Sequence, residues 1–172
     1  MKRLLVVVDM QNDFVSGALG SGRARKIVSA VCGLIAKERA AGTDVVFTQD
    51  THGADYLQSQ EGKLLPVKHC VRGTEGWKLI PELAPYAEGA KVFEKDTFGS
   101  TGVASFARSG GYGEILLCGV CTDICVIGNA FLLKAYCPEA AVRVCASACA
   151  GSSPAGHRDA LKAMKRSQIY ID

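Results

Sequence analysis

Short apolar runs alternate with stretches of helical periodicity along the whole chain. The run of Leu and Val at residues 4–8 is continuous, which is typical of a strand buried on both faces. Residues 22–41 carry apolar side chains at a helical period, and Gly42 ends that helix. The same reading predicts further strands at 44–48, 92–94, 115–118, 141–145 and 169–171, and further helices at 102–108, 123–136 and 154–166.

Strands that alternate with helices predict a doubly wound α/β fold. We expect one domain over residues 1–172, with a mostly parallel sheet of five to six strands and helices on both faces. Such sheets bind ligands at the carboxyl ends of their strands. Residues that follow or close a predicted strand therefore become candidates: Asp9, Asp50, Lys95, Gly119 and Cys145.

Composition narrows the class of protein. A net charge of +3 without a concentrated basic run gives no reason to expect nucleic-acid or membrane binding. Eight cysteines could indicate a disulfide-rich secreted domain, but 172 residues can form a core without such links. The apolar run at 4–8 is also too short for an export signal. We therefore expect a reducing, cytoplasmic location.

The segment Gly119–Val126 carries the first candidate for chemistry. It joins a predicted strand to a predicted helix, so Cys125 falls near the first helical turn. Unpaired N–H groups and the helix dipole there favour an anion, which predicts a lowered thiol pKa and a nucleophilic cysteine. The alternative is a buried core cysteine. The pair Cys118 and Cys121 forms a C-x-x-C, for which metal or redox use is the less favoured hypothesis.

A nucleophilic thiol requires a proton acceptor and a cation. Asp9 directly follows an apolar strand, so partial desolvation should raise its pKa and suit it to act as a base. Lys95 could stabilise the thiolate and orient Asp9. The alternatives are an aspartate that caps a turn and an ordinary surface lysine.

Asp50, His52 and His69 form a second candidate group. Asp-x-His after a strand, with a second histidine from the same loop, provides ligands for a divalent metal, and Glu61 between them could add another. The long segment 51–79 that carries them lacks clear periodicity, and loops of that length are usually functional. The alternative is a set of polar loop residues without a metal.

Four motifs in order resemble the isochorismatase-like cysteine hydrolases, and among them most closely the nicotinamidases. They are Asp9–Phe14, Asp50 with His52 and His69–Thr74, Glu94–Ser100, and Gly119–Val126, in which Cys121 replaces the family's usual Ala. The resemblance runs from about residue 4 to about 171 and implies a Rossmann-like, three-layer fold.

The resemblance also implies a mechanism. Asp9 takes the proton of Cys125, and the thiolate attacks a small amide, with backbone N–H groups of Cys121 and Cys125 forming the oxyanion hole. It implies a cis Val120–Cys121 peptide bond, substrate contacts from Phe14 and Val120, and a homodimer or homotetramer. A zinc, iron or manganese ion would be held by Asp50, His52 and His69. The implied reaction is deamidation of nicotinamide to nicotinate and ammonia, as in NAD salvage.

One departure from the family pattern bears on the substrate. Nicotinamidases often stack the pyridine ring on a Trp shortly before the second metal-binding His, whereas residues 64–67 here are Leu-Leu-Pro-Val and the single Trp, Trp77, comes later. Three alternatives stay open: a ureido, N-carbamoyl or isochorismate-type hydrolase, a non-catalytic binding protein, and a redox sensor in which Cys125 pairs with Cys121.

Overall fold

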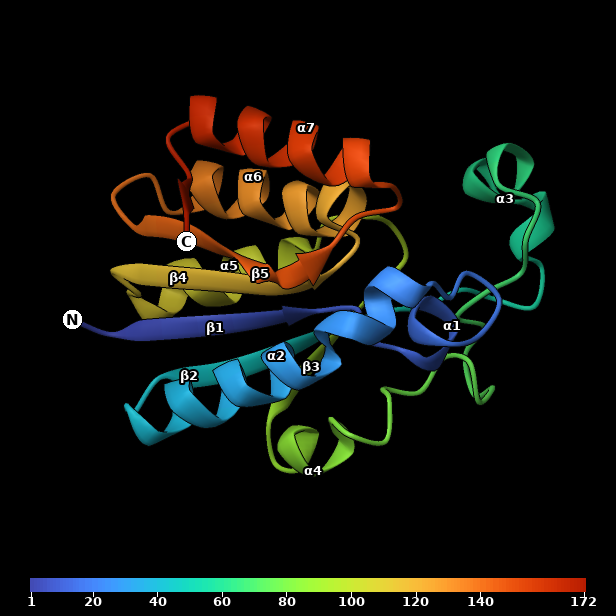
Figure 1. Cartoon of the computed structure of the whole chain (residues 1–172), viewed down its shortest axis with the longest axis horizontal. Helices are drawn as coiled ribbons and strands as arrows, with labels where there is room; N and C mark the ends of the chain where they lie inside the picture. The colour runs from blue at the N-terminus through green and yellow to red at the C-terminus, as the bar shows by residue number, and fades with distance from the viewer.

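Six parallel strands form one sheet in the order β3-β2-β1-β4-β5-β6 in the computed structural model, which describes residues 1–172 (Figure 1). The strands are β1 (Arg3–Val8), β2 (Asp44–Asp50), β3 (Lys91–Lys95), β4 (Glu114–Val120), β5 (Ala141–Ala150) and β6 (Tyr170–Ile171). The predicted fold class is confirmed, including the burial of β1, in which Leu4 to Val8 are all fully buried.

Helices cover both faces of this sheet. They are α1 (Asn12–Val15), α2 (Gly22–Ala40), α3 (Gln60–Leu64), α4 (Ala84–Ala87), α5 (Thr101–Gly110), α6 (Ile127–Tyr136) and α7 (Pro154–Arg166), with a 3-10 turn η1 (Tyr56–Gln58) and a π-helical turn η2 (Thr122–Val126). In Figure 1, α2 lies across one face, while α5, α6 and α7 pack side by side on the other. This split follows from right-handed crossovers, because the chain reverses its direction across the sheet after β3.

Several strands are longer than predicted, and one predicted helix is divided in two. β2 and β3 run on to Asp50 and Lys95, because these two residues pair with each other in the sheet. β5 extends to Ala150 through an irregularity opposite Cys118, since Leu117 pairs with Val144 but Gly119 pairs with Cys149. The predicted helix at 123–136 is divided into η2 and α6. The segment 51–79 contains η1 and α3, which its sequence did not reveal.

The backbones of β1 and β4 approach each other closely at Gly119, in the centre of the sheet. Gly119 has φ +116°, and a Cβ atom there would lie 2.1 Å from the carbonyl oxygen of Val8. Only glycine therefore fits at this position. Since Asp9 follows Val8 and the turn to Cys125 follows Gly119, this close approach brings the two predicted catalytic segments together.

None of the helices combines the length and the apolar character needed to cross a bilayer.

Candidate active site and metal centre

The carboxyl ends of four adjacent strands deliver the candidate catalytic residues to one place. Asp9 follows β1, Asp50 closes β2, Lys95 closes β3, and Cys125 lies in η2 directly after β4. All four side chains are buried, with residue exposures of 6% or less. The order β3-β2-β1-β4 makes these strands neighbours, so residues separated by more than a hundred positions in the sequence come into contact.

Lys95 contacts each of the other three residues of this group. Its Nζ atom lies 2.7 Å from Asp9 Oδ2, 3.0 Å from Asp50 Oδ1 and 3.6 Å from Cys125 Sγ. Burial alone would lower the pKa of the ammonium, but the charges of Asp9, Cys125 and Asp50 outweigh it and raise that pKa. The lysine is therefore a fixed positive charge facing the thiol, not an ordinary surface residue.

Asp9 has the environment of a general base. Thr48 Oγ1 donates to Asp9 Oδ1 at 2.6 Å, whereas Asp9 Oδ2 accepts no hydrogen bond of good geometry and has the Lys95 ammonium as its ion-pair partner. Burial raises the pKa of this carboxyl, with Lys95 and Thr48 acting in the opposite direction. Oδ2 thus has room to accept a proton, and the rise in the Asp9 pKa expected from its sequence position is found here.

The expected lowering of the Cys125 pKa is wrong for this structure. Burial raises the pKa of the thiol well above its usual value, the charge of Asp9 adds to the rise, and Lys95 only partly opposes it. The helix-terminus argument failed because the thiol is buried beside a carboxylate, while the dipole effect is modest. Cys125 therefore rests as a thiol and needs a base to activate it.

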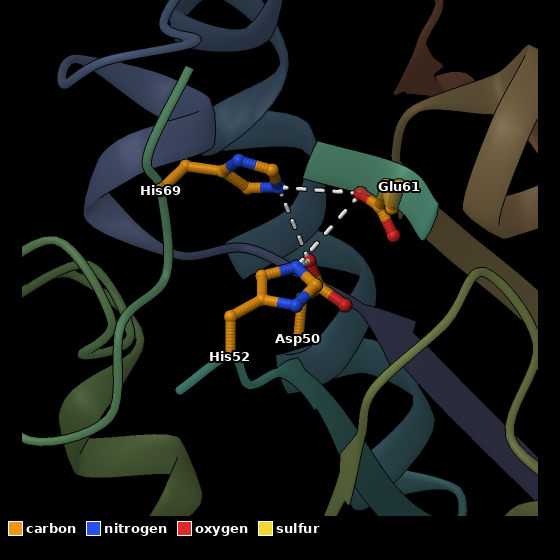
Figure 2. Close-up of side chains that lie close together, drawn as sticks. All are labelled: Asp50, His52, Glu61 and His69. Atoms are coloured by element: carbon orange, nitrogen blue, oxygen red, sulfur yellow. Dashed lines mark hydrogen bonds and ion pairs between the residues drawn. The ribbon is translucent and has the colours of Figure 1, made fainter. Parts of the chain in front are cut away.

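Four side chains converge beside Lys95 to form a candidate metal centre (Figure 2). His52 Nε2 lies 2.9 Å from Asp50 Oδ2, and His69 Nε2 lies 3.5 Å from the same oxygen. Glu61 Oε1 is 3.8 Å from His52 Nε2 and 3.7 Å from His69 Nε2. One ligand atom from each of the four residues lies within 4.8 Å of all the others.

The donor set fits a divalent ion. His69 Nδ1 lies 2.8 Å from the Val67 carbonyl, which selects the tautomer with Nε2 free to bind a metal. Two imidazole nitrogens and two carboxylate oxygens suit zinc, iron or manganese. The structure thus brings together the three predicted ligands Asp50, His52 and His69. It also places Glu61, which the sequence suggested as a further ligand, in the same group.

Residues that the sequence reading missed hold this arrangement in place. Gln11 accepts from the Asp50 N–H and donates to the Asp50 carbonyl, both at 2.8 Å. Asp13 Oδ2 accepts from the N–H of Cys70, next to His69, at 2.8 Å. Asn129 donates to the Cys125 carbonyl at 2.8 Å. Gln11 and Asp13 stand in the same polar run as Asp9, and that clustering was the available signal.

A cavity of about 400 Å³ opens onto Cys125. The expected substrate contacts Phe14 and Val120 line it, together with Cys121, whose peptide bond to Val120 is cis as the resemblance implies. Asp50 and Glu61 also line the cavity, so it touches both the thiol and the candidate metal centre. A small, mostly apolar molecule with one polar group fits such a space.

The aromatic side chain that the sequence lacks before His69 is not supplied by Trp77. Leu65 lines the wall of the cavity, and Phe98, which is 46% exposed, forms another part of it. Trp77 is not part of the lining; its Nε1 donates to Thr51 Oγ1 at 2.8 Å, and its carbonyl accepts from Gln11 and Gln49. Trp77 is therefore held by hydrogen bonds outside the cavity lining and does not replace a stacking ring.

All eight cysteines are unpaired. Cys118 is buried in β4 while Cys121 lies in the following turn, as the sequence predicted for the C-x-x-C pair.

Comparison with known proteins points to one family. The sequence model of the isochorismatase domain family matches residues 3–171 of this chain. An uncharacterized isochorismatase family protein, PncA, of Bacillus subtilis is 33% identical over 173 residues, covering 94% of this chain and 93% of the relative.

Solved structures agree with the sequence comparison. A crystal structure of the nicotinamidase/pyrazinamidase PncA from Bacillus subtilis superposes with a TM-score of 0.88 at 32% identity and covers 99% of both chains. The pyrazinamidase of Pyrococcus horikoshii, solved in complex with zinc, superposes with a TM-score of 0.87 at 28% identity, covering 100% of this chain and 99% of its own.

Proposed function

Because the chain belongs to the isochorismatase family and is an amide-hydrolysing enzyme, we propose that it deamidates nicotinamide, or a closely similar small amide, through a thioester on Cys125. The observation that carries the proposal is the contact of Lys95 with both Asp9 and Cys125 at the floor of the cavity. A binding protein would have no need of a buried base, cation and thiol in mutual contact.

The proposed reaction begins with proton transfer from Cys125 to Asp9 as the sulfur attacks the amide carbonyl carbon. Asp9 is suited to this because Lys95 is the one partner of its buried Oδ2, and Lys95 offsets the negative charge that passes between thiol and carboxyl. We assign the oxyanion hole to the backbone N–H groups of Cys121 and Cys125.

Collapse of the tetrahedral intermediate breaks the C–N bond. Asp9 returns its proton to the departing nitrogen, so ammonia leaves and the acyl group stays on Cys125 as a thioester. Asp9 then takes a proton from water, whose oxygen attacks the thioester and releases the carboxylic acid and the thiol. Each proton gained by Asp9 is given back within the cycle, so one residue serves both half-reactions.

The candidate metal centre would position the substrate. Asp50, His52, Glu61 and His69 would hold a zinc, iron or manganese ion, which would supply a Lewis-acidic site for the ring nitrogen of a pyridine amide. Because Asp50 and Glu61 line the cavity, a ring whose amide faces Cys125 would have its far side near this centre. Phe14 and Val120 would contact the ring.

We further propose that residues 1–172 act as a single domain, in a cytoplasmic homodimer or homotetramer, and that nicotinamide hydrolysis would place the enzyme in NAD salvage. The specific alternative is a different small amide or ureido compound. Leu65 supports it, because an aliphatic wall offers a pyridine ring less than an aromatic one would.

Ammonia release from nicotinamide by zinc-, iron- or manganese-loaded protein tests the proposal. Turnover of about one per second or more is expected for a physiological substrate. The Cys125→Ala variant should be inactive, while Cys145→Ala, a matched loss of a partly exposed thiol from β5, should retain activity. Trapping with hydroxylamine should yield the hydroxamic acid if a thioester forms. An active Cys125→Ala enzyme would overturn the mechanism, and inactivity on nicotinamide with turnover of another amide would overturn the substrate.

A further inference from the structure

A second groove lies at the end of β5, next to the substrate cavity, with which it shares the lining residues Arg23, Ala150 and Gly151. Its volume is about 300 Å³, and its floor is the strand end at residues 149–151. Arg23 and Lys26 of α2 form one wall, and His157 and Arg158 of α7 form the other. β6 pairs with β5 only at Arg143 and Val144, so no strand covers the edge of β5 at the groove.

The groove has the charge of an anion site. No carboxylate is among the residues that line it, and neither Arg23, Lys26 nor Arg158 forms an ion pair anywhere in the structure. The groove also reaches Pro154, the first residue of the 13-residue helix α7. Ser153 caps the N-terminus of that helix and the Asp123 carboxylate lies against Gly156, so the positive charge of the groove comes from its three cationic side chains. Three cations that lack an ion-pair partner and surround one groove suit a small, multiply charged oxyanion.

Hydrogen bonds connect both walls of the groove to η2, the turn that carries Cys125. Arg23 Nε donates to the Gly151 carbonyl at 3.3 Å and Arg23 Nη2 donates to the Ser152 carbonyl, while the Ser152 N–H donates to Asp123 Oδ1 at 2.8 Å. On the other wall, His157 Nδ1 lies 2.8 Å from Thr122 Oγ1. Thr122 and Asp123 belong to η2, the same five-residue turn as Cys125.

We propose that this groove binds a phosphate-class oxyanion, either free phosphate or the phosphate end of a nucleotide, and that its occupation changes the reactivity of Cys125. Arg23 and Arg158 can each offer paired N–H donors to phosphate oxygens, the geometry in which guanidinium groups bind phosphate best. A bound anion competes with the Gly151 and Ser152 carbonyls for Arg23, which loosens the support of η2.

Calorimetric titration with inorganic phosphate, at constant ionic strength maintained with potassium chloride, tests the site. The Lys26→Gln/Arg158→Gln double variant removes two cations that lie outside the catalytic and metal groups, and should bind phosphate roughly tenfold more weakly. Lys165→Gln, an exposed charge loss farther along α7, should bind like the unaltered protein. Absent phosphate binding, or equal affinity in the double variant, overturns the proposal.

Adenosine monophosphate distinguishes the two sources of the anion. Binding tighter than that of inorganic phosphate, and lost in the double variant, supports a nucleotide; equal or weaker binding with the same loss supports free phosphate. If the double variant still binds inorganic phosphate or adenosine monophosphate as the unaltered protein does, the groove is not the binding site.

The rate of Cys125 alkylation by iodoacetamide tests the coupling without any amide substrate, so its outcome is independent of the proposed function. Saturating phosphate should increase the rate about twofold or more, since the population with a loosened η2 rises. The double variant should lose this response and Lys165→Gln should keep it. An unchanged rate under conditions in which phosphate is bound would overturn the coupling.

Discussion

Asp50 Oδ1 accepts a hydrogen bond from the Lys95 ammonium at 3.0 Å, while the other carboxylate oxygen, Oδ2, faces the two metal-site histidines. One carboxylate therefore joins the thiol chemistry to the candidate metal centre. Burial alone would raise the pKa of Asp50, but hydrogen bonds from His52 and His69 and the charge of Lys95 lower it overall. Asp50 is thus anionic at neutral pH and is available to both groups.

Replacement of Lys95 by Met should destabilise the fold strongly. Asp9 and Asp50 would then face each other, buried, without their shared cation, and loss of one partner from a buried charge cluster costs about 3–5 kcal/mol. Because the pKa of Asp9 is already raised, protonation at low pH should relieve part of the loss. Urea unfolding at pH 7 and pH 4.5 would measure this difference.

The control for that experiment is Lys91→Met, an exposed lysine at the opposite end of β3. It should change the free energy of unfolding by less than about 1 kcal/mol at either pH. A Lys95→Met protein as stable as this control would show that the cluster is not held by charge.

The pKa of Cys125 predicts an alkylation profile unlike that of a resting thiolate. The rate of modification by iodoacetamide should keep rising beyond pH 9, because burial and Asp9 raise the pKa of the thiol. The pH dependence of kcat/KM should instead show an acid limb above the ordinary Asp value of about 4, since the carboxylate form of Asp9 is required and its pKa is raised. An alkylation plateau below pH 7 would contradict this assignment.

Thr48→Val should move the acid limb to higher pH. The Thr48 hydroxyl donates to Asp9 Oδ1 and lowers the pKa of that carboxyl, so its loss raises the pKa further. Thr43→Val is a matched control, because it also removes a buried hydroxyl that donates to a carboxylate, Glu38, far from the site. Both variants should lose about 1–3 kcal/mol of stability, but only Thr48→Val should shift the profile.

Glu61→Gln tests whether the fourth residue of the candidate centre is a ligand. Competition with a fluorescent zinc chelator should show an affinity about 10–100-fold weaker, because a charged donor becomes a neutral one. Glu88→Gln, an exposed carboxylate at the end of α4, should leave the affinity unchanged. Equal zinc affinity in both variants would limit the centre to Asp50, His52 and His69.

Leu65→Trp should favour aromatic amides. A ring added to the cavity wall should lower KM for nicotinamide about fivefold relative to an aliphatic amide, equivalent to roughly 1 kcal/mol of stacking. Leu64→Trp places the same ring on a side chain that is 78% exposed and outside the cavity lining, so the ratio should not change. The ratio of kcat/KM for the two substrates is the measurement, and no change with Leu65→Trp would show that residue 65 does not contact the ring.

Much of this site was predictable because strand ends follow from local apolar runs. Asp9 follows such a run, Lys95 follows the predicted strand at 92–94, and the parallel sheet then places them together. The pKa of Cys125 was not predictable in the same way, since it depends on how fully the rest of the chain buries the thiol. Glu61 could be named from the sequence as a possible ligand, but its position on α3 could not be predicted, because the segment 51–79 lacks periodicity and tertiary contacts determine its path.

Burial of the Cys125 thiol against Lys95 has a consequence for folding as well as chemistry. The contact requires β3 to add to β2 and the turn after β4 to close, so the chain must complete its most distant strand pairings before this thiol is shielded. Partly folded chains would expose a cysteine that the mature enzyme hides. Its protection from alkylation would therefore mark the pairing of β3, β2, β1 and β4 during synthesis or refolding.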